Sequence, residues 1–309
     1  METTRKIRKV LISQPTLEGA GVHIRRGFGF REVPQFDPFL MFDDFRQDDP
    51  AKYLPGFPWH PHRGIETITY MIRGTAEHGD SLGHKGVIGP GGVQWMTAGS
   101  GIIHQEMPRG GPDGRMGGFQ LWANLPAALK MTEPRYRDVK KADIPDVDLP
   151  GGVAVRVICG AVDKARGPVR DIVIDPEYLD VAMPPEAEFA HPTKPGHTVF
   201  ACVYEGEGCF SGETRQPSYD IEPASYFDLE RKPVQGDHAI ILFGDGSRIK
   251  VRTTASPLRF LLISGRPLGQ PVAWQGPVVM NTQDELRTAF REYRAGTFLK
   301  TGRPPGATK

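Results

Sequence analysis

The sequence predicts an all-β protein made of two β-barrels, followed by one amphipathic helix. Short runs rich in β-branched and aromatic residues recur along the chain and end at glycine or proline turns. Glycine and proline are frequent, with 37 and 29 residues, as expected for many short strands joined by turns. Near the C-terminus, residues 282–295 change to the spacing of a helix.

The first half contains the clearest strand patterns. Residues 76–84 are polar and contain glycine, so we expect a loop there. Asp43 and Asp44 close one apolar run; we expect them to face solvent, the alternative being a hydrogen bond to a metal-binding histidine. The predicted strands of this half are 22–24, 28–30, 39–45, 67–72, 93–97 and 119–125.

The second half repeats the pattern after a proline-rich, charged segment. We therefore predict a first barrel over 1–130, a linker over 131–150 and a second barrel over 151–309. Thr282 and Glu285 form a capping box, which marks the start of the helix predicted over 282–295. Its apolar stripe is expected to pack on a barrel. The predicted strands are 153–158, 199–204, 239–243, 249–251 and 259–265.

Composition excludes several classes of protein. With 38 Lys and Arg against 37 Asp and Glu, the chain lacks the basic excess of a protein that binds nucleic acid through phosphates. No apolar run approaches the roughly 18 residues needed to span a bilayer, and the N-terminus lacks a signal-peptide core. The three cysteines do not suggest a disulfide framework. We expect a cytoplasmic protein, or a nuclear one if the source is eukaryotic.

Two pairs of metal-ligand residues stand out in the first half. His60 and His62, and then His104 and Glu106, are each separated by one residue. In a strand, residues i and i+2 point to the same face. If the two strands face each other across a barrel, three imidazoles and one carboxylate converge on one point. The histidines of the second half lack this spacing, so we expect no metal there.

The residues around these pairs resemble the pirin family of the cupin superfamily. The resemblance rests on His60-Pro61-His62-Arg63-Gly64-x-Glu66-Thr67 and on Gln94-Trp95-Met96-Thr97-Ala98-Gly99-x-Gly101-Ile102-x-His104-x-Glu106-Met107. Asp37-Pro38-Phe39-Leu40, Gln120-Leu121-Trp122-x-Asn124-Leu125 and Gly276-Pro277-x-Val279-Met280-Asn281-Thr282 also match. The resemblance runs from about residue 20 to residue 295.

Membership would imply two tandem cupin barrels, of the jelly-roll type, with metal in the N-terminal barrel. It implies a non-haem iron held by His60, His62, His104 and Glu106, with Glu66 as a supporting residue. Mixed imidazole and carboxylate ligands suit Fe(II), while spacing alone leaves Mn, Co, Ni, Cu and Zn open. The absence of cysteine from the motif disfavours a structural zinc site.

The resemblance also implies an activity, quercetin 2,3-dioxygenase, in which a flavonol ring is opened with O2. Glu106 is the expected base. Phe45, Phe57 and Met107 are expected walls for a flat substrate, the alternative being ordinary core packing. A competing interpretation is a redox-sensing regulator that acts through a protein partner, as implied by transcriptional co-regulation in the family. A third is a sugar-binding or isomerase cupin without oxygen chemistry.

Overall fold

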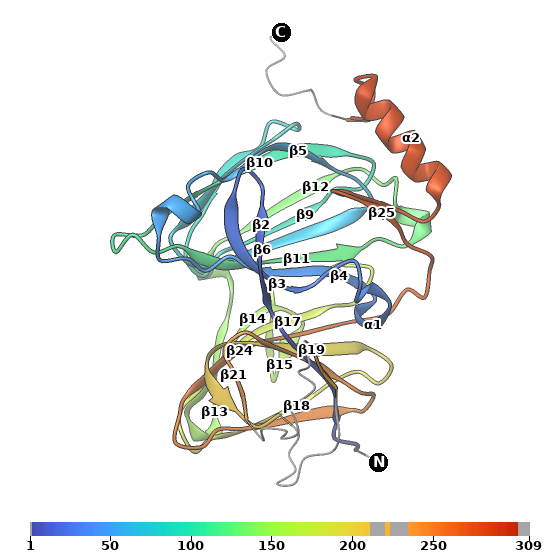
Figure 1. The fold of residues 1–309 in the computed structure, drawn as a ribbon. Coiled ribbons are helices and arrows are strands. Elements are labelled where there is room, and N and C mark those ends of the chain that lie inside the picture. Colours follow the sequence, from blue (N-terminus) through green and yellow to red (C-terminus); the bar gives the residue numbers. More distant parts are fainter. Residues whose placement is uncertain (1, 211–219, 223–233, 302–309) are drawn as a thin grey trace. The chain divides into compact units, whose positions relative to one another are not determined.

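The computed structural model describes residues 2–210, 220–222 and 234–301, which are mainly β-strands (Figure 1). The chain forms two compact units. The larger unit contains residues 14–141 and 268–309, and the smaller unit contains residues 1–13 and 142–267. The predicted all-β class with two β-sheet domains and a C-terminal helix is confirmed.

Both ends of the chain belong to units other than those expected from the sequence. Strand β1 (Ile7–Ile12) pairs antiparallel with β22 (Ala239–Phe243), which places the first 13 residues in the smaller unit. Val278 in β26 (Val278–Met280) bridges to Arg63, so the segment after residue 267 belongs to the larger unit. The expected boundaries at 130 and 151 therefore differ from the units, because these long-range strand pairings join the ends of the chain to distant segments.

The segment predicted as a linker, 131–150, contains two paired strands. Strand β12 (Arg135–Val139) pairs with β9 (Val93–Thr97) of the larger unit, and β13 (Asp146–Leu149) pairs with β14 (Val153–Cys159) of the smaller unit. Proline and charge suggested a linker, but the prolines lie just outside these strands, where no ladder hydrogen bond is lost.

Two antiparallel sheets form the larger unit. Their strand orders are β12-β9-β6-β11-β4-β3-β2 and β5-β10-β7-β8. Residues from both sheets line one cavity, so the two sheets face each other. The remaining elements of this unit are β2 (Gln14–Glu18), β3 (Val22–Phe28), α1 (Val33–Phe36), β4 (Phe39–Asp44), β5 (Phe57–His62), β6 (Ile65–Arg73), β7 (Thr75–Asp80), β8 (Lys85–Ile88), β10 (Ile102–Arg109), β11 (Gly117–Asn124), β25 (Ala273–Gln275) and α2 (Gln283–Arg294).

Two local predictions for this unit are wrong. The loop expected over 76–84 contains β7, which pairs with both β10 and β8. The polar residues of this segment suggested a solvent-exposed loop, but His78 and Asp80 are buried in a polar cluster. In place of the two short strands expected over 22–24 and 28–30, residues 22–28 form one strand, β3, which pairs with β4, and residues 29–30 lie outside it.

Helix α2 confirms the prediction from its capping box. The Thr282 hydroxyl accepts a hydrogen bond from the backbone N–H of Glu285, and the Glu285 carboxylate accepts one from the backbone N–H of Thr282. Leu286 and Ala289 are buried in a cluster with residues of β25 and β26. Tyr293 is 42% exposed, so the buried stripe is narrower than the sequence suggested.

The smaller unit is built on one large sheet and an aliphatic core. Its main sheet has the order β13-β14-β17-β24-β19-β22-β1-β20, and β18 pairs with β23. Its three cysteines are buried thiols that form no disulfide in the described structure. The remaining strands are β15 (Ala161–Val162), β16 (Ala165–Arg166), β17 (Glu177–Met183), β18 (Glu188–Pro192), β19 (Thr198–Gly208), β20 (Asp220–Glu222), β21 (Gln235–Gly236), β23 (Arg248–Arg252) and β24 (Leu258–Gly265).

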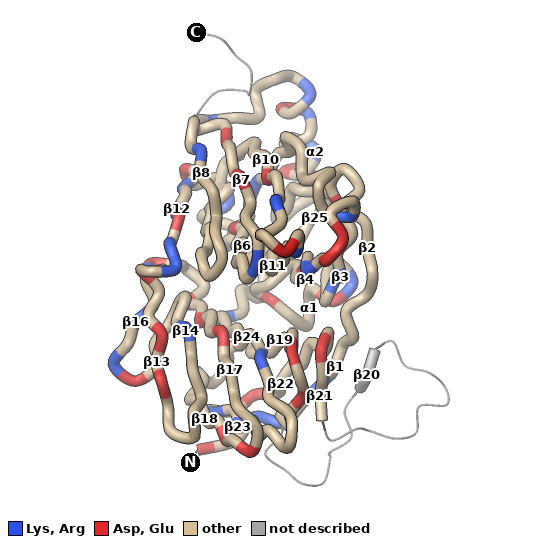
Figure 2. Tube along the Cα trace, turned by 90° about the vertical axis from the view of Figure 1, so that its left-hand side faces the viewer, with Lys and Arg blue, Asp and Glu red and all other residues tan. Residues whose placement is uncertain are grey.

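Charge and hydropathy follow the composition. Lys and Arg positions are interspersed with Asp and Glu positions along the strands (Figure 2). In the described part of the chain, no helix has both the length and the apolar character that a bilayer crossing requires.

Candidate metal centre

Three histidines converge in the larger unit. His60 and His62 lie on β5, and His104 lies on the neighbouring strand β10, directly opposite His60. One ring nitrogen from each residue lies within 4.8 Å of the others. The i, i+2 spacing therefore aims both β5 imidazoles at one point. The expectation that the two ligand strands face each other across a barrel is wrong, because β5 and β10 are neighbours in one sheet.

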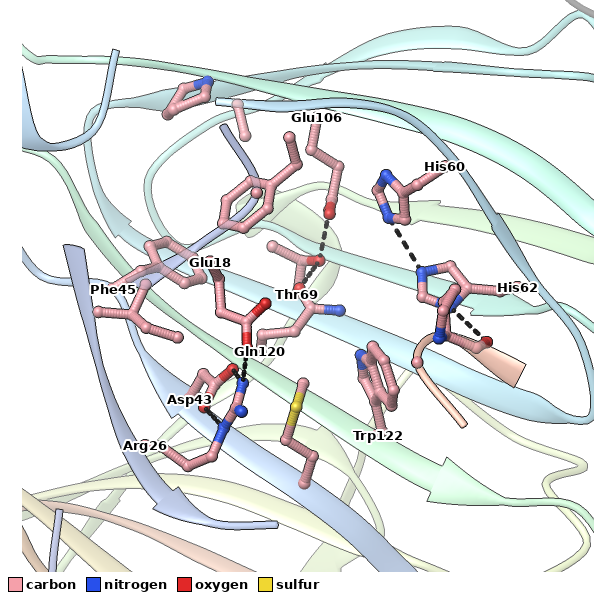
Figure 3. A pocket seen from close by; sticks show the side chains of 18 of the residues that line it. Glu18, Arg26, Asp43, Phe45, His60, His62, Thr69, Glu106, Gln120 and Trp122 are labelled. Carbon is pink, nitrogen blue, oxygen red and sulfur yellow. Dashed lines mark hydrogen bonds and ion pairs between the residues drawn. The ribbon is translucent and has the colours of Figure 1, made fainter. Parts of the chain in front are cut away.

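Hydrogen bonds orient the two imidazoles of β5. His60 Nδ1 lies 2.8 Å from the carbonyl oxygen of Pro58, and His62 Nδ1 lies 3.2 Å from that of Pro277. If each Nδ1 carries the proton and donates it to its carbonyl, both Nε2 atoms present lone pairs. These two atoms are 3.1 Å apart (Figure 3). Two facing lone pairs repel each other, and a cation bound by both removes that repulsion.

The site therefore fits a metal ion. Two nitrogens at about 2.1 Å from one ion and at a right angle lie about 3 Å apart, close to the distance between the Nε2 atoms. His104 is fully buried, and neither of its ring nitrogens has a hydrogen-bond partner among the described residues. An unpaired buried polar group is costly, and coordination would satisfy one of the two.

The electrostatics favour ligand chemistry. Burial, together with the neighbouring imidazoles, lowers the pKa of His62 and of His104 well below the usual value. Both rings are therefore neutral at pH 7, which is the form that binds a metal.

Glu106 is not part of this group of donor atoms. The set of ligand atoms within 4.8 Å of one another in the described residues contains the three histidines alone. In the pairing of β10 with β5, the register shifts between His104 and Glu106. The Glu106 carboxylate instead accepts a hydrogen bond of 3.0 Å from the hydroxyl of Thr69, as Figure 3 shows. Its role as a fourth ligand stays a prediction.

Glu66 has a supporting role. It is buried and accepts hydrogen bonds from Trp95 Nε1, at 3.1 Å, and from the hydroxyl of Thr97, at 2.8 Å. Both partners lie on β9, the strand next to Glu66. These bonds hold β6 and β9 together.

A cavity of about 680 Å³ is lined in part by His60 and His62. Phe45 and Phe57 line it as predicted, but Met107 does not. Residues alternate between the two faces of β10, and Glu106 and Pro108 occupy the cavity face. The lining residues are Glu18, Gly19, Ile24, Arg26, Phe30, Met41, Asp43, Phe45, Phe57, Pro58, Trp59, His60, His62, Thr69, Ala76, Glu106, Pro108, Met116, Gln120, Trp122, Trp274, Gly276 and Pro277.

Sequence reasoning missed several residues of this site. Trp122 stands edge-on to His62, with ring centroids 5.0 Å apart. The sequence did contain a signal for Trp122, because Gln120 and Trp122 are two residues apart in a predicted strand and therefore share one face. Trp274 and Pro277 reach the cavity from the end of the chain, and no local pattern connects them with His62.

The turn that follows His62 is fixed by buried cations. Arg63 donates to the carbonyls of Ser100 and Phe298, both at 2.7 Å. Lys130 Nζ donates to the carbonyls of Gly64, at 2.8 Å, and Val279, at 2.9 Å, and to the Asn124 side chain. Burial lowers the pKa of Lys130 to about 7.

Gly64 allows the close approach in this turn. It has a φ of +79°, and a Cβ atom there would lie 2.0 Å from the Val279 carbonyl oxygen. A larger residue would therefore displace the C-terminal segment.

The expectation that Asp43 and Asp44 face solvent is wrong. Both are buried. Asp43 accepts from Arg26 Nε and Nη2 at 2.9 and 2.8 Å, and Asp44 forms an ion pair with Arg46. Burial raises the pKa of Asp43 to about 6 against the opposing effect of Arg26. The strand therefore ends in two ion pairs, Arg26–Asp43 and Arg46–Asp44, whose carboxylates are buried.

A second polar cluster lies behind His104. The His78 ring centroid is 5.4 Å from that of His104, and His78 Nε2 is 3.3 Å from an oxygen of Asp80. His84 Nδ1 lies 3.0 Å from the same oxygen. Tyr136 stacks against both histidine rings. Asp80 is buried, but its hydrogen bonds from His78 and His84 outweigh burial and lower its pKa.

Two β-sheet units, one of them with three histidines converging beside a cavity, define a bicupin with a candidate metal centre. Comparison with known families is more specific. The family described as Pirin matches residues 21–123, and the Pirin C-terminal cupin domain matches residues 178–299. The chain belongs to the pirin family.

Curated relatives cover nearly the whole chain. A pirin-like protein of Caulobacter vibrioides is 43% identical, over 95% of this chain and 99% of the relative. A Pseudomonas aeruginosa protein, provisionally named a quercetin 2,3-dioxygenase, is 38% identical, over 96% of this chain and 99% of that protein.

Solved structures show the same fold. A crystal structure of quercetin 2,3-dioxygenase from Acinetobacter baumannii has a TM-score of 0.81 at 28% identity, and the match covers 96% of this chain and 99% of that one. A bacterial pirin from Escherichia coli, solved in complex with nickel(II), has a TM-score of 0.60 at 21% identity and supports the fold alone; the match covers 86% of this chain and 100% of that one.

Proposed function

We propose that this pirin is a metal-dependent dioxygenase that opens the ring of a flavonol such as quercetin with O2. The supporting observation is the buried His104 imidazole, which has no hydrogen-bond partner among the described residues and groups with His60 and His62. His60 and His62 line an aromatic cavity. The name of the Acinetobacter baumannii structure supports the same substrate class.

His60, His62 and His104 would hold the metal, with Glu106 as the proposed fourth ligand. Fe(II) is the first choice for such a donor set, and Mn, Co, Ni, Cu and Zn are the alternatives. The metal supplies a Lewis acid and a template that bring the substrate hydroxyl and O2 together.

The cavity walls would orient a flat substrate. Phe45, Phe57, Trp122 and Trp274 present rings to the cavity. Trp122 also contacts His62, so a ring stacked on this wall would lie next to the candidate metal centre.

Glu106 is the proposed base. Its carboxylate lines the cavity two residues after His104 and is held by the Thr69 hydroxyl. It would accept the proton of the flavonol 3-hydroxyl, which makes the ring electron-rich enough to react with O2. Both oxygen atoms enter the ring-opened ester, and the carbon that carried the 3-hydroxyl leaves as carbon monoxide.

The experiment uses full-length protein purified without oxygen and loaded with Fe(II). Mixed with quercetin in air, it should bleach the flavonol absorbance and release one carbon monoxide for each quercetin consumed. His62→Ala and His104→Ala should lose iron and turnover together. His23→Ala, an exposed position on β3, is the control and should retain both. Full iron occupancy in His104→Ala would refute the ligand assignment, and an iron-loaded wild type that leaves quercetin intact would refute the activity.

A further inference from the structure

A row of polar side chains crosses the cavity floor of the larger unit. These residues lie directly opposite one another in the strand register. Arg26 on β3 lies opposite Asp43 on β4, Asp43 lies opposite Gln120 on β11, and Gln120 lies opposite Thr69 on β6. Directly opposed residues of antiparallel strands point to the same face. All four residues line the cavity. We call these four residues the polar row.

The polar row leads away from the histidines. Its Thr69 end bonds to Glu106, the proposed base. Three strand spacings of about 4.8 Å put the Arg26 end about 14 Å from Thr69. The neighbouring row on the same floor is apolar, with Trp122 opposite Met41. A long substrate bound at the histidines would therefore lie over apolar side chains and reach polar groups at its far end.

The Arg26 end is a built arrangement of charged groups. Arg26 donates two hydrogen bonds to Asp43, whose side chain is 7% exposed. Arg26 Nη2 also lies 2.8 Å from Glu18 Oε1. Arg26 Nη1 has no partner among the described residues and remains available as a donor. The Glu18 side chain is 41% exposed, so its carboxylate is available as an acceptor.

The charge balance at this end selects the kind of ligand. One guanidinium faces two carboxylates, so the group carries a net charge of about −1 when all three are ionised. This charge disfavours a substrate carboxylate or phosphate at that position. A neutral hydroxyl suits it, because a hydroxyl donates to Glu18 and accepts from Arg26. A bare hydrocarbon ring would displace water from Arg26 Nη1 and from the Glu18 carboxylate without offering a hydrogen bond to either group.

We propose that Glu18 and Arg26 recognise phenolic hydroxyl groups at the end of the substrate remote from the metal. The substrate class is then a flavonol hydroxylated on an outer ring, in preference to one that carries the 3-hydroxyl alone. This inference rests on the proposed function and deepens it. Glu18 and Arg26 determine specificity here, whereas Thr69 and Gln120 belong to the end of the row that holds Glu106.

The test compares quercetin with 3-hydroxyflavone, which lacks the outer hydroxyls, in the iron-loaded wild type and in Glu18→Ala. We expect wild-type kcat/KM to be at least tenfold higher for quercetin. Glu18→Ala should reduce this preference at least fivefold. The ratio between substrates cancels any general damage to the fold. The control is Glu77→Ala, a half-buried glutamate on β7 that pairs with Arg109 and does not line the cavity; its preference should equal that of the wild type.

An equal loss of kcat/KM for both substrates in Glu18→Ala, or no loss for either, would overturn the proposal. Its failure is distinguishable from failure of the dioxygenase activity. If neither flavonol is consumed, their dissociation constants can still be compared by quenching of tryptophan fluorescence, since Trp122 and Trp274 line the cavity. A wild-type binding preference for quercetin that Glu18→Ala removes would support hydroxyl recognition without turnover, and equal binding would overturn it.

Discussion

Replacing Lys130 with methionine should loosen the turn that carries His62. Lys130 Nζ is buried and donates to the carbonyls of Gly64 and Val279 and to the Asn124 side chain. Methionine fills a similar volume but supplies no donor. Lys130→Met therefore removes the ammonium donor from three acceptors. It also removes the link that Lys130 makes between the turn after His62 and the C-terminal segment.

The size of the effect follows from these three bonds. Each intramolecular hydrogen bond contributes about 1 kcal/mol net, and more when the donor is charged. Methionine also avoids the cost of burying an ammonium group, which offsets part of the loss. We expect the larger unit to lose about 3 kcal/mol of stability. At a urea m value of about 2 kcal/mol/M, the unfolding midpoint falls by about 1.5 M.

Tryptophan fluorescence measures this unit specifically. The chain has four tryptophans, and Trp59, Trp95, Trp122 and Trp274 all belong to the larger unit. Urea unfolding followed by tryptophan emission therefore reports on this unit without a contribution from the smaller one. The same samples can be titrated with Fe(II), and we expect the iron affinity of Lys130→Met to fall because Gly64 lies two residues from His62.

Lys140→Met is the matched control, since Lys140 is 59% exposed on its side chain and pairs with Asp138 at the surface. Its midpoint should change by less than the equivalent of about 0.5 kcal/mol. If Lys130→Met also falls within that limit, the buried ammonium does not stabilise the turn and the reasoning is refuted.

Other predictions concern the metal centre. Glu106→Gln should lower quercetin turnover at least tenfold, whereas its iron content should fall less than twofold. Steady-state kinetics and metal analysis of the same sample check this, and a wild-type rate would exclude Glu106 as the base. Fe(II) at 100 times its dissociation constant should raise the free energy of unfolding of the wild type by about 2.7 kcal/mol and that of His104→Ala by almost nothing. Urea unfolding measures both values, and equal increases would place the metal elsewhere. Iron should quench tryptophan emission, and Trp122→Phe should lose more than half of that quenching because Trp122 contacts His62; undiminished quenching would contradict this arrangement.

The histidine geometry was predictable because it is local. His60 and His62 share a strand face by the period of two alone, and His104 has the same orientation on the next strand. The position of Glu106 was less predictable, because the register shift after His104 and the bond to Thr69 depend on pairing between strands. Met107 was misplaced for a simpler reason, since alternation from His104 and Glu106 already assigns it to the other face.

The long-range features had no local signal. The pairing of β1 with β22 joins segments more than 200 residues apart in the chain, and the bond between His62 and Pro277 spans 215 residues. Proline content and charge suggested a linker over 131–150, and the change of unit between Lys141 and Ala142 lies inside that segment. Which unit each end of the chain joins is decided by tertiary pairing and not by composition.

The contribution of the C-terminal segment to the His62 site has a consequence for biosynthesis. Trp274 and Pro277 complete the cavity wall, and Arg63 is held by Phe298. On the ribosome, the sheets of the larger unit emerge well before these residues, so the nascent site stays open until residues 274–298 have also emerged. Release of a chain truncated near residue 267 would leave the imidazole of His62 without its carbonyl partner and the aromatic wall unfinished.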